Sequence, residues 1–216
     1  IPEPIADEVA VYTTDMMSTG FVAAENADIP VGGDVAVFAQ GPVGLMATAG
    51  ARLQGAGRVF AVETTPKRQD IARQYGADVV IDFEDESPIQ VIMDHTSGVG
   101  VDAAIEALGT PDTFAQCVEA VKPGGTVSNV GYHGSGDEVP IPREEWGVGM
   151  AEKEITTALC PGGRLRLRRL LRLLEHGRVD PTHLTTHEFA FDEVDRAFEL
   201  MESKSDGVIK PLVNFD

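Results

Sequence analysis

A glycine-rich turn at residues 39–44 is the first stretch of this sequence whose residue types can do chemistry. It reads Ala-Gln-Gly-Pro-Val-Gly and follows a strongly apolar run. In a nucleotide-binding turn, one glycine lets the backbone approach a pyrophosphate and another lets the next helix pack closely on the strand. Gly41 and Gly44 are spaced for these two roles. Ala39 stands where a further glycine is usual, and we expect it to make the tight turn at a negative φ.

The turn opens a helical pattern at residues 42–55, in which Pro42 and Val43 hold the first positions. Proline suits the first turn of a helix because the amide that it lacks would have no partner there. The remaining free amides, at the positive end of the helix dipole, attract phosphate. We therefore predict a dinucleotide site in which Gly41, Pro42, Val43 and Gly44 contact the pyrophosphate.

An acidic residue ends the next apolar run, about 20 residues beyond the turn. At this position in a βαβ unit, Glu63 is placed to accept hydrogen bonds from the ribose hydroxyls of adenosine. A carboxylate there repels a 2′-phosphate, so the sequence favours NAD over NADP. Thr64, Thr65 and Arg68 follow directly and are expected to line the same part of the cofactor site, where the basic side chain softens this preference.

Apolar runs and helical patterns alternate regularly after the turn. Strands separated by helices of this length pair in parallel through right-handed crossovers. An α/β fold with a doubly wound, parallel six-stranded sheet is therefore predicted. The predicted strands are residues 34–40, 58–63, 78–83, 101–108, 126–132 and 154–159, and the helices between them are 42–55, 66–76, 88–96 and 110–125. A helix from about residue 163 and a strand within 207–215 lie outside this pattern.

The charge balance is strongly acidic: 35 Asp and Glu stand against 17 Lys and Arg, giving a formal net charge of −18. Such a field repels phosphate backbones, which argues against nucleic acid as a partner. The acidity suits either an ordinary cytoplasmic protein or a halophilic one. The two cysteines suggest no disulfide framework. No apolar run reaches the ~20 residues that a membrane span requires, so no membrane partner is expected.

Five segments, one of which begins in the glycine turn, resemble one family, the zinc-dependent medium-chain alcohol dehydrogenases. Within this family they resemble the microbial secondary-alcohol (isopropanol-type) branch. They are TTDMMSTGF (13–21), GPVGLMATAGARLQGAGRV (41–59), VKPGGTVSNVGYHGSGD (121–137), IPREEWGVGMAEKEI (141–155) and LCPGGRLR (159–166). The resemblance implies a Rossmann domain at 19–159. It also implies remnants of a GroES-like catalytic domain, namely its tail at 1–18 and its C-terminal return at 160–216.

The same resemblance implies an enzyme that interconverts small secondary alcohols and ketones by hydride transfer, with a nicotinamide cofactor and zinc. In this branch the Asp of TDMM is a zinc ligand, which here is Asp15. Without the family, a helix N-cap is the better interpretation of Asp15, because Thr and Asp precede a helical pattern. A catalytic zinc takes three protein ligands. We therefore expect a Cys- and His-bearing segment upstream of Ile1 in the natural protein.

The resemblance also implies roles in cofactor binding and subunit contact for residues at strand ends and at the C-terminus. Met150 matches a position that contributes to a neighbouring subunit's substrate pocket, and Tyr132 one that approaches that subunit. A dimer or tetramer is implied, joined along the strand at 154–159. The residues expected to line the cofactor are Ala107, Leu108, Val130, Gly131, Tyr132 and Lys210.

Two alternatives stay open. A zinc-free quinone reductase of the same superfamily shares the nucleotide turn, although the Asp of TDMM argues against it. A non-catalytic dinucleotide-binding and oligomerisation module is what residues 1–216 support by themselves.

Overall fold

Six parallel strands form the central sheet of the computed structural model, which describes residues 1–215. Their order across the sheet is β3-β2-β1-β4-β5-β6. This order reverses direction between β1 and β4, as in dinucleotide-binding folds. The predicted doubly wound α/β class is confirmed. The strands are β1 (Asp34–Phe38), β2 (Arg58–Val62), β3 (Val79–Ile81), β4 (Val101–Glu106), β5 (Val121–Asn129) and β6 (Glu154–Thr157).

Each α-helix between consecutive strands of this sheet begins with proline, whose fixed φ suits the first helical position. These helices are α3 (Pro42–Leu53), α4 (Pro66–Gln74), α5 (Pro88–His95) and α6 (Pro111–Ala120). Ser87 and Thr110 also cap α5 and α6, accepting hydrogen bonds from the amides of Gln90 and Thr113. The four predicted crossover helices are therefore confirmed, with ends shifted by a few residues.

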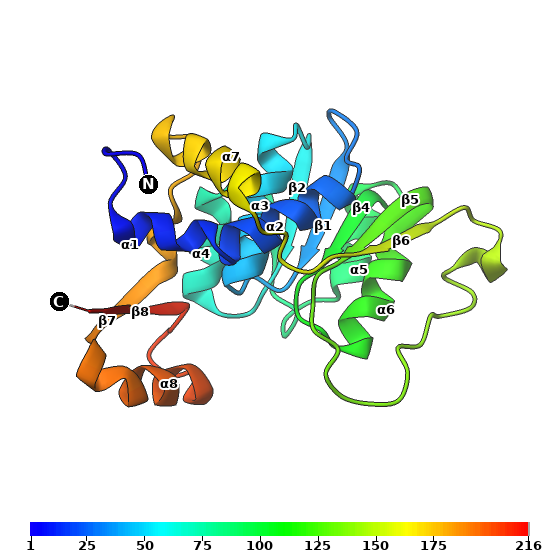
Figure 1. Cartoon of the computed structure of the whole chain (residues 1–216). Helices are drawn as coiled ribbons and strands as arrows, with labels where there is room; N and C mark the ends of the chain where they lie inside the picture. Colours follow the sequence, from blue (N-terminus) through cyan, green and yellow to red (C-terminus); the bar gives the residue numbers. More distant parts are fainter. Residues whose placement is uncertain (216) are drawn as a thin grey trace.

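Two layers of helices cover the sheet (Figure 1). On one face, α2 (Met16–Asn26) and α3 bury alanines against Val35, Val37 and Ile105 of the central strands. On the other face, α5 and α6 bury a second apolar cluster around Phe38 and Phe60. The core strands are apolar on both faces because helices remove both faces from water.

One helix end differs from its prediction. The sequence 110–125 was expected to stay helical up to the Pro-Gly-Gly at 123–125, but α6 ends at Ala120. Val121 already pairs with Val101 of β4, and the register shifts before Ala103 pairs with Thr126. Pro123 and the glycines thus form an irregularity inside β5, where proline is tolerated because it need not donate to the ladder.

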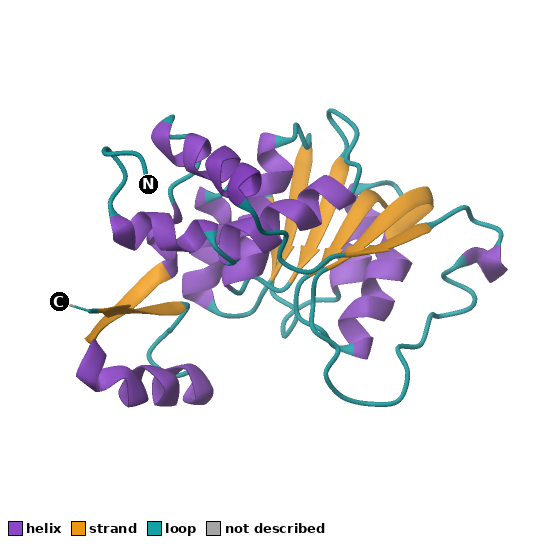
Figure 2. Ribbon diagram, viewed as in Figure 1, coloured by secondary structure: helices purple, strands orange, loops and turns teal. Residues whose placement is uncertain are grey.

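A second, two-stranded parallel sheet forms near the C-terminus (Figure 2). It provides the partner that the predicted last strand lacked, since β8 (Lys210–Asn214) pairs with β7 (Thr185–Ala190). The predicted helix near residue 163 is α7 (Arg164–Glu175). The remaining elements are α1 (Asp7–Ala10), η1 (Val11–Thr13), η2 (Gly147–Gly149), η3 (Pro181–Leu184), η4 (Phe191–Glu193) and α8 (Val194–Ser203). Across residues 1–215, no helix combines the length and apolar character that a bilayer crossing needs.

Helices α2 and α3 pack closely because Gly20 has no side chain. A Cβ at Gly20 would lie 2.5 Å from Met46 Cβ and 2.7 Å from the backbone nitrogen of Ala47. Both atoms belong to α3, and neither can move without shifting that helix.

Substitution of Gly20 by Ala should therefore lower the free energy of unfolding by about 2 kcal/mol, because overpacking outweighs the gain in helix propensity. Chemical denaturation followed by circular dichroism measures this. The matched control is Gly162→Ala. Among the described residues, no atom beyond its chain neighbours lies within 4 Å of a Cβ there, and its effect should stay within about 0.5 kcal/mol. Equal effects of the two substitutions would contradict the close-packing interpretation.

Candidate functional site

The glycine turn joins β1 to α3 and leaves one side of its backbone open. Gly41 is the N-cap residue of α3, and a Cβ added there would meet no atom of residues 1–215 within 4 Å, apart from its chain neighbours. The amides of Val43 and Gly44 belong to the first helical turn, where no partner exists within the helix. Gly44 faces the other way, and a Cβ on it would overlap the carbonyl oxygen of Ala39. One glycine thus keeps a surface open while the other packs tightly.

Ala39 contradicts our expectation of a negative φ. Its φ is +71°, in the left-handed region that glycine adopts most readily. The amide of Ala39 continues the β1–β2 ladder by donating to the carbonyl of Val62 at 3.1 Å. The carbonyl oxygen of Ala39 also lies directly against Gly44 in the first turn of α3. The backbone therefore reverses its direction at Ala39. The condition under which alanine readily replaces glycine, a negative φ, is therefore not met at this position.

Glu63 is buried and holds two segments together. Its Oε1 accepts hydrogen bonds from the amides of Thr64 and Thr65, at 3.0 and 2.9 Å. Its Oε2 accepts from the amide of Gln40 at 3.2 Å and lies 3.5 Å from the guanidinium of Arg68. A carboxylate has about four acceptor positions. Three backbone amides occupy three of them, and the remaining position faces Arg68. A ribose hydroxyl at Glu63 would take that position.

Gln40 is a site residue that the sequence analysis missed. Its side chain is fully buried, donating to the carbonyl of Val37 and accepting from the Thr48 hydroxyl of α3. These bonds fix the turn between strand and helix. A polar residue inside an otherwise apolar strand–turn junction was the available signal.

A cavity of about 400 Å³ opens where the carboxyl ends of β1, β2 and β4 meet. This is the point where the strand order reverses, at which open α/β sheets bind their ligands. Of the predicted residues, Glu63, Arg68 and Leu108 line it, whereas Phe83, Thr113 and Gln116 were not predicted. The full lining is Phe38, Ala39, Val62, Glu63, Arg68, Phe83, Pro88, Leu108, Asp112, Thr113 and Gln116. Phe83 follows the end of β3 and therefore lies at the same edge of the sheet. This position in the sequence was the signal that could have placed it in the cavity.

Two loops lie side by side next to this cavity, at the ends of β4 and β5. The first carries Ala107 and Leu108, and the second carries Val130, Gly131 and Tyr132. The prediction had placed all five residues within strands, but these strands end at Glu106 and Asn129. The loops are in contact, because a Cβ on Gly109 would overlap the backbone of Tyr132. The Tyr132 side chain points into solvent and is 87% exposed.

Asp15 and Lys210 share a small hollow of about 160 Å³. Asp15 holds the N-cap position of α2, but in the described chain its side chain makes no capping hydrogen bond. The N-cap interpretation is therefore wrong for the side chain. Its Oδ1 accepts a hydrogen bond from the Thr19 hydroxyl at 2.9 Å instead. Residues 1–215 contain no cluster of three or more His, Cys, Asp or Glu that could hold a metal ion. These residues alone do not assemble a zinc site, although Asp15 could supply one ligand.

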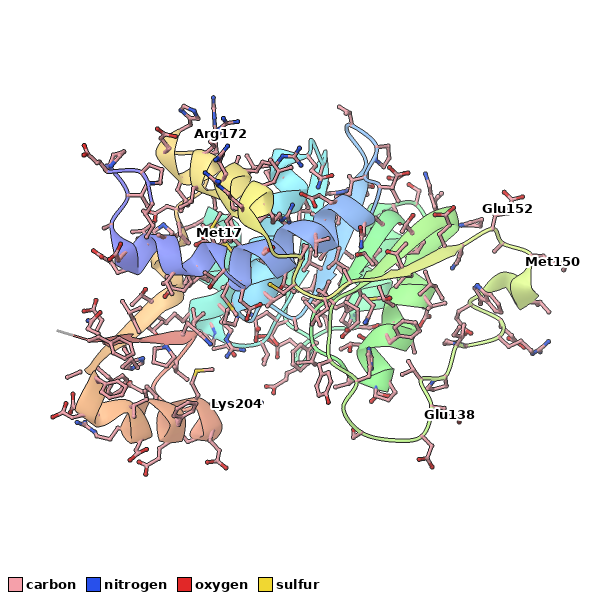
Figure 3. All side chains as sticks on the ribbon, in the orientation of Figure 1. Met17, Glu138, Met150, Glu152, Arg172 and Lys204 are labelled. Carbon is pink, nitrogen blue, oxygen red and sulfur yellow. The ribbon has the colours of Figure 1, made fainter. Side chains whose placement is uncertain are left out.

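Met150 lies apart from the other predicted residues, on the long loop between β5 and β6. It is 80% exposed, near the tip of a segment that projects away from the sheet (Figure 3).

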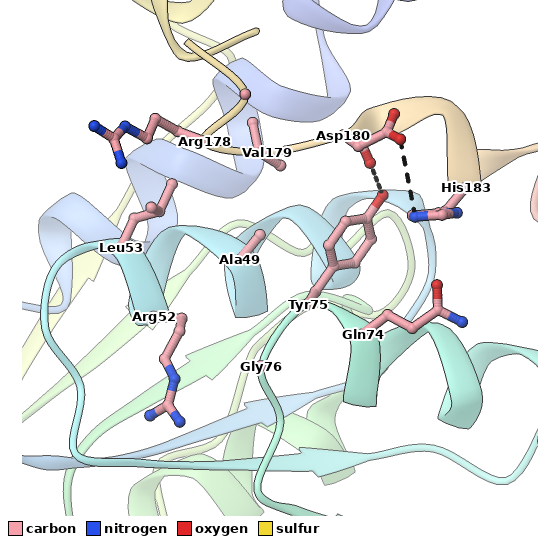
Figure 4. Close-up of a pocket in the computed structure, with 11 residues that line it drawn as sticks. Ala49, Arg52, Leu53, Gln74, Tyr75, Gly76, Arg178, Val179, Asp180 and His183 are labelled. Carbon is pink, nitrogen blue, oxygen red and sulfur yellow. Dashed lines mark hydrogen bonds and ion pairs between the residues drawn. The ribbon is translucent and has the colours of Figure 1, made fainter.

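Another hollow, of about 320 Å³, lies at the opposite end of α3 (Figure 4). It is lined by the last turns of α3 and α4 and by the segment 177–183. There Tyr75 donates its hydroxyl proton to the carbonyl of Asp180 at 2.7 Å, and burial raises the pKa of Tyr75. The glycine turn is one helix length away, ~18 Å for twelve residues, so this hollow is separate from the cavity beside that turn.

A family model for zinc-binding dehydrogenases matches residues 42–176, which is more than half of the chain. The chain belongs to this family. It is 52% identical over 214 residues to the NADP-dependent isopropanol dehydrogenase of Thermoanaerobacter brockii, covering 99% of this chain and 61% of that protein. It is 48% identical over 210 residues to an alcohol dehydrogenase of Cupriavidus necator, covering 97% of this chain and 57% of that one.

Among solved structures, the alcohol dehydrogenase TADH from Thermus sp. ATN1 matches with a TM-score of 0.90 at 30% sequence identity. The match covers all of this chain and 61% of that one. This zinc-binding dehydrogenase chain thus spans about three fifths of the length of these relatives.

Ala39→Gly should raise the free energy of unfolding by about 1 kcal/mol. An L-residue loses about 1–2 kcal/mol in the left-handed region, and part of this gain is offset by the greater freedom of glycine in the unfolded chain. Ala51→Gly in α3 is the control and should lower stability by about 2 kcal/mol, because the loss of a buried methyl group adds to the loss of helix propensity. Thermal and urea unfolding measure both. A destabilised Ala39→Gly variant would contradict the assigned backbone conformation.

Proposed function

We propose that this chain is the cofactor-binding part of an enzyme that interconverts secondary alcohols and ketones by hydride transfer. The observation that carries the proposal is the open glycine turn at the start of α3, beside a cavity at the switch point of the sheet. The names of relatives that are 52% and 48% identical over the aligned residues support the substrate class. In the reaction, the alcohol carbon would give its hydride to the nicotinamide while the hydroxyl proton leaves. The bound cofactor supplies the hydride acceptor.

We infer that Val43, Gly44 and the open backbone of Gly41 contact the pyrophosphate. Pro42 contributes a fixed φ rather than a donor. The adenosine would occupy the cavity between Glu63, Arg68 and Leu108, with Thr64 and Thr65 at its rim. The nicotinamide half would then extend along Ala107 and Val130–Tyr132 toward Lys210. The two loops beside the cavity and the shared hollow of Asp15 and Lys210 support this direction.

We further propose that the chain contributes to two domains. Residues 19–159 would form the dinucleotide-binding domain, and residues 1–18 and 160–216 would belong to the catalytic domain. The separate β7–β8 sheet supports this division. Asp15 would be one zinc ligand in the complete enzyme, with the others contributed from outside residues 1–215.

A homo-oligomer is also proposed. β6 is an edge strand of the sheet, and such an edge offers unpaired backbone groups to a second copy. The exposed Met150, on the projecting loop, is suited to reach a neighbouring subunit's substrate pocket.

NAD is proposed as the preferred cofactor, although several relatives are named NADP-dependent. The support is local: a buried carboxylate at Glu63, with its charge shared by three amides and one guanidinium. A 2′-phosphate beside it would meet this negative charge in a partly desolvated site.

Glu63→Gln should strengthen NADPH binding about tenfold and leave NADH binding within about threefold. The amide keeps the shape and one acceptor oxygen, while removal of the charge frees Arg68 to pair with a 2′-phosphate. Titration of nucleotide fluorescence with the 216-residue chain measures both. Asp34→Asn, which alters an acid at the far end of β1, is the control. Tighter NADPH than NADH binding by the unaltered chain would contradict the NAD proposal.

Gly41→Ala tests the phosphate contact itself. Because a Cβ there has room and the φ of Gly41 is an ordinary −68°, stability should change by less than about 0.5 kcal/mol. The same methyl group would stand where the pyrophosphate must approach, so NADH binding should weaken at least about tenfold. Unchanged binding in the folded variant would refute the site.

Intact mass and zinc content of the protein from its native source separate a complete dehydrogenase from a module of 216 residues.

A further inference from the structure

Glu106, the last residue of β4, is fully buried and binds both loops beside the cavity. Its backbone carbonyl accepts hydrogen bonds from the amides of Val130 and Gly131, at 2.9 and 3.2 Å. Its side-chain Oε1 accepts from the amides of Leu108 and Gly109, at 3.0 and 2.8 Å. One residue therefore holds the loop after β4 and the loop after β5 in a fixed relation.

The second carboxylate oxygen reinforces this junction. Oε2 of Glu106 lies against the α-carbon of Gly131, where any Cβ would overlap both this oxygen and the amide of Gly109. Within residues 1–215, Oε2 accepts no hydrogen bond. The Nε2 of His133 lies 3.7 Å away and donates to Oδ1 of Asn129 at 2.9 Å. The Asn129 amide group donates in turn to the carbonyl of Gly131 at 3.1 Å, which orients the imidazole.

Packing alone does not explain a carboxylate at this place. Phe114 and Cys117 of α6 are buried on the same side of the sheet and would accommodate an apolar residue. Burial of a carboxylate is costly unless its oxygens are hydrogen-bonded. Here Oε1 is satisfied by two loop amides and by the Thr113 hydroxyl at 2.7 Å. The two amide bonds thus order the loop after β4, and the Thr113 bond joins the carboxylate to the first turn of α6.

We propose that Glu106 is a positioning residue that holds these two loops at the spacing required by the nicotinamide half of the cofactor. This inference rests on the proposed function, since it assumes that the loops line a dinucleotide. Glu106 does not touch the cofactor, because its side chain is covered by the loops that it binds. Its loss should therefore weaken binding of NADH much more than binding of AMP, which lacks the nicotinamide half and keeps Glu63 and Arg68 when the loop at Leu108 loses its order.

The test compares three variants of the 216-residue chain. Glu106→Leu removes every acceptor of the side chain and leaves the amides of Leu108 and Gly109 unpaired, so NADH binding should weaken at least about tenfold. AMP binding should stay within about threefold. Glu106→Gln keeps one acceptor oxygen for the same amides and should restore NADH binding to within about threefold of the unaltered chain. Ser128→Ala, a buried position on the neighbouring strand, is the matched control and should change neither constant.

Fluorescence titration measures NADH binding and calorimetry measures AMP binding, with circular dichroism establishing that each variant is folded. Hydrogen exchange of the Leu108 and Gly109 amides, measured without nucleotide, should be fast in Glu106→Leu and slow in Glu106→Gln. If Glu106→Leu does not fold, Gly131→Ala takes its place, because the added methyl group separates the loops with the carboxylate retained. It should give the same selective loss for NADH.

The possible failures are distinguishable. Absence of both NADH and AMP binding in the unaltered chain would overturn the proposed function, and the role of Glu106 with it. Equal losses for the two nucleotides, or undiminished NADH binding in Glu106→Leu or in Gly131→Ala, would overturn the role of Glu106 alone.

Discussion

The close contact between Gly44 and the carbonyl of Ala39 is the constraint on which the rest of the site depends. It brings the first turn of α3 directly onto the end of β1 and drives Ala39 into a left-handed conformation. With α3 placed in this way, α2 can cross it at Gly20, and the free amides of α3 face the reversal point of the sheet. Close packing on one side of the turn thus produces the open surface on the other.

Two buried glutamates then order the sheet edge around this turn. Glu63 and Glu106 each sit at the end of a strand that flanks β1, and each binds two amides of the loop that follows. A carboxylate that accepts several backbone hydrogen bonds is stable in a core that would otherwise exclude it. The two sites differ in their second oxygen, because Glu63 has Arg68 as a partner and Glu106 faces Gly131 and His133. One edge of the sheet therefore combines an acid that has a guanidinium partner with one that no guanidinium pairs in the described chain.

The order of strands and crossover helices could be predicted from the sequence, because apolar runs, prolines at helix starts and glycines at turns are local signals. The positions of Gly41, Gly44 and Glu63 followed from the same local pattern. Roles that depend on the three-dimensional placement of individual side chains could not be predicted. Gln40 reads as an ordinary polar turn residue until Val37 and Thr48 surround it. The φ of Ala39 depends on its close contact with Gly44, and the partner of β8 is a strand on the other side of α8. Asp15 reads as a cap although its side chain bonds to Thr19.

The long connection between β5 and β6 also bears on how the chain folds. β1, α3 and β2 are neighbours in sequence, and their pairing closes short loops, so this part of the sheet can form early. β6 can pair with β5 only after residues 130–153 have been brought back across the molecule, with one short 3₁₀ turn as their sole regular structure among the described residues. Closing such a loop yields a ladder of four residue pairs, from Thr126–Glu154 to Asn129–Thr157. We expect this edge of the sheet to form after the central strands have paired, so the strand proposed to meet another copy of the chain is also one that pairs late in folding.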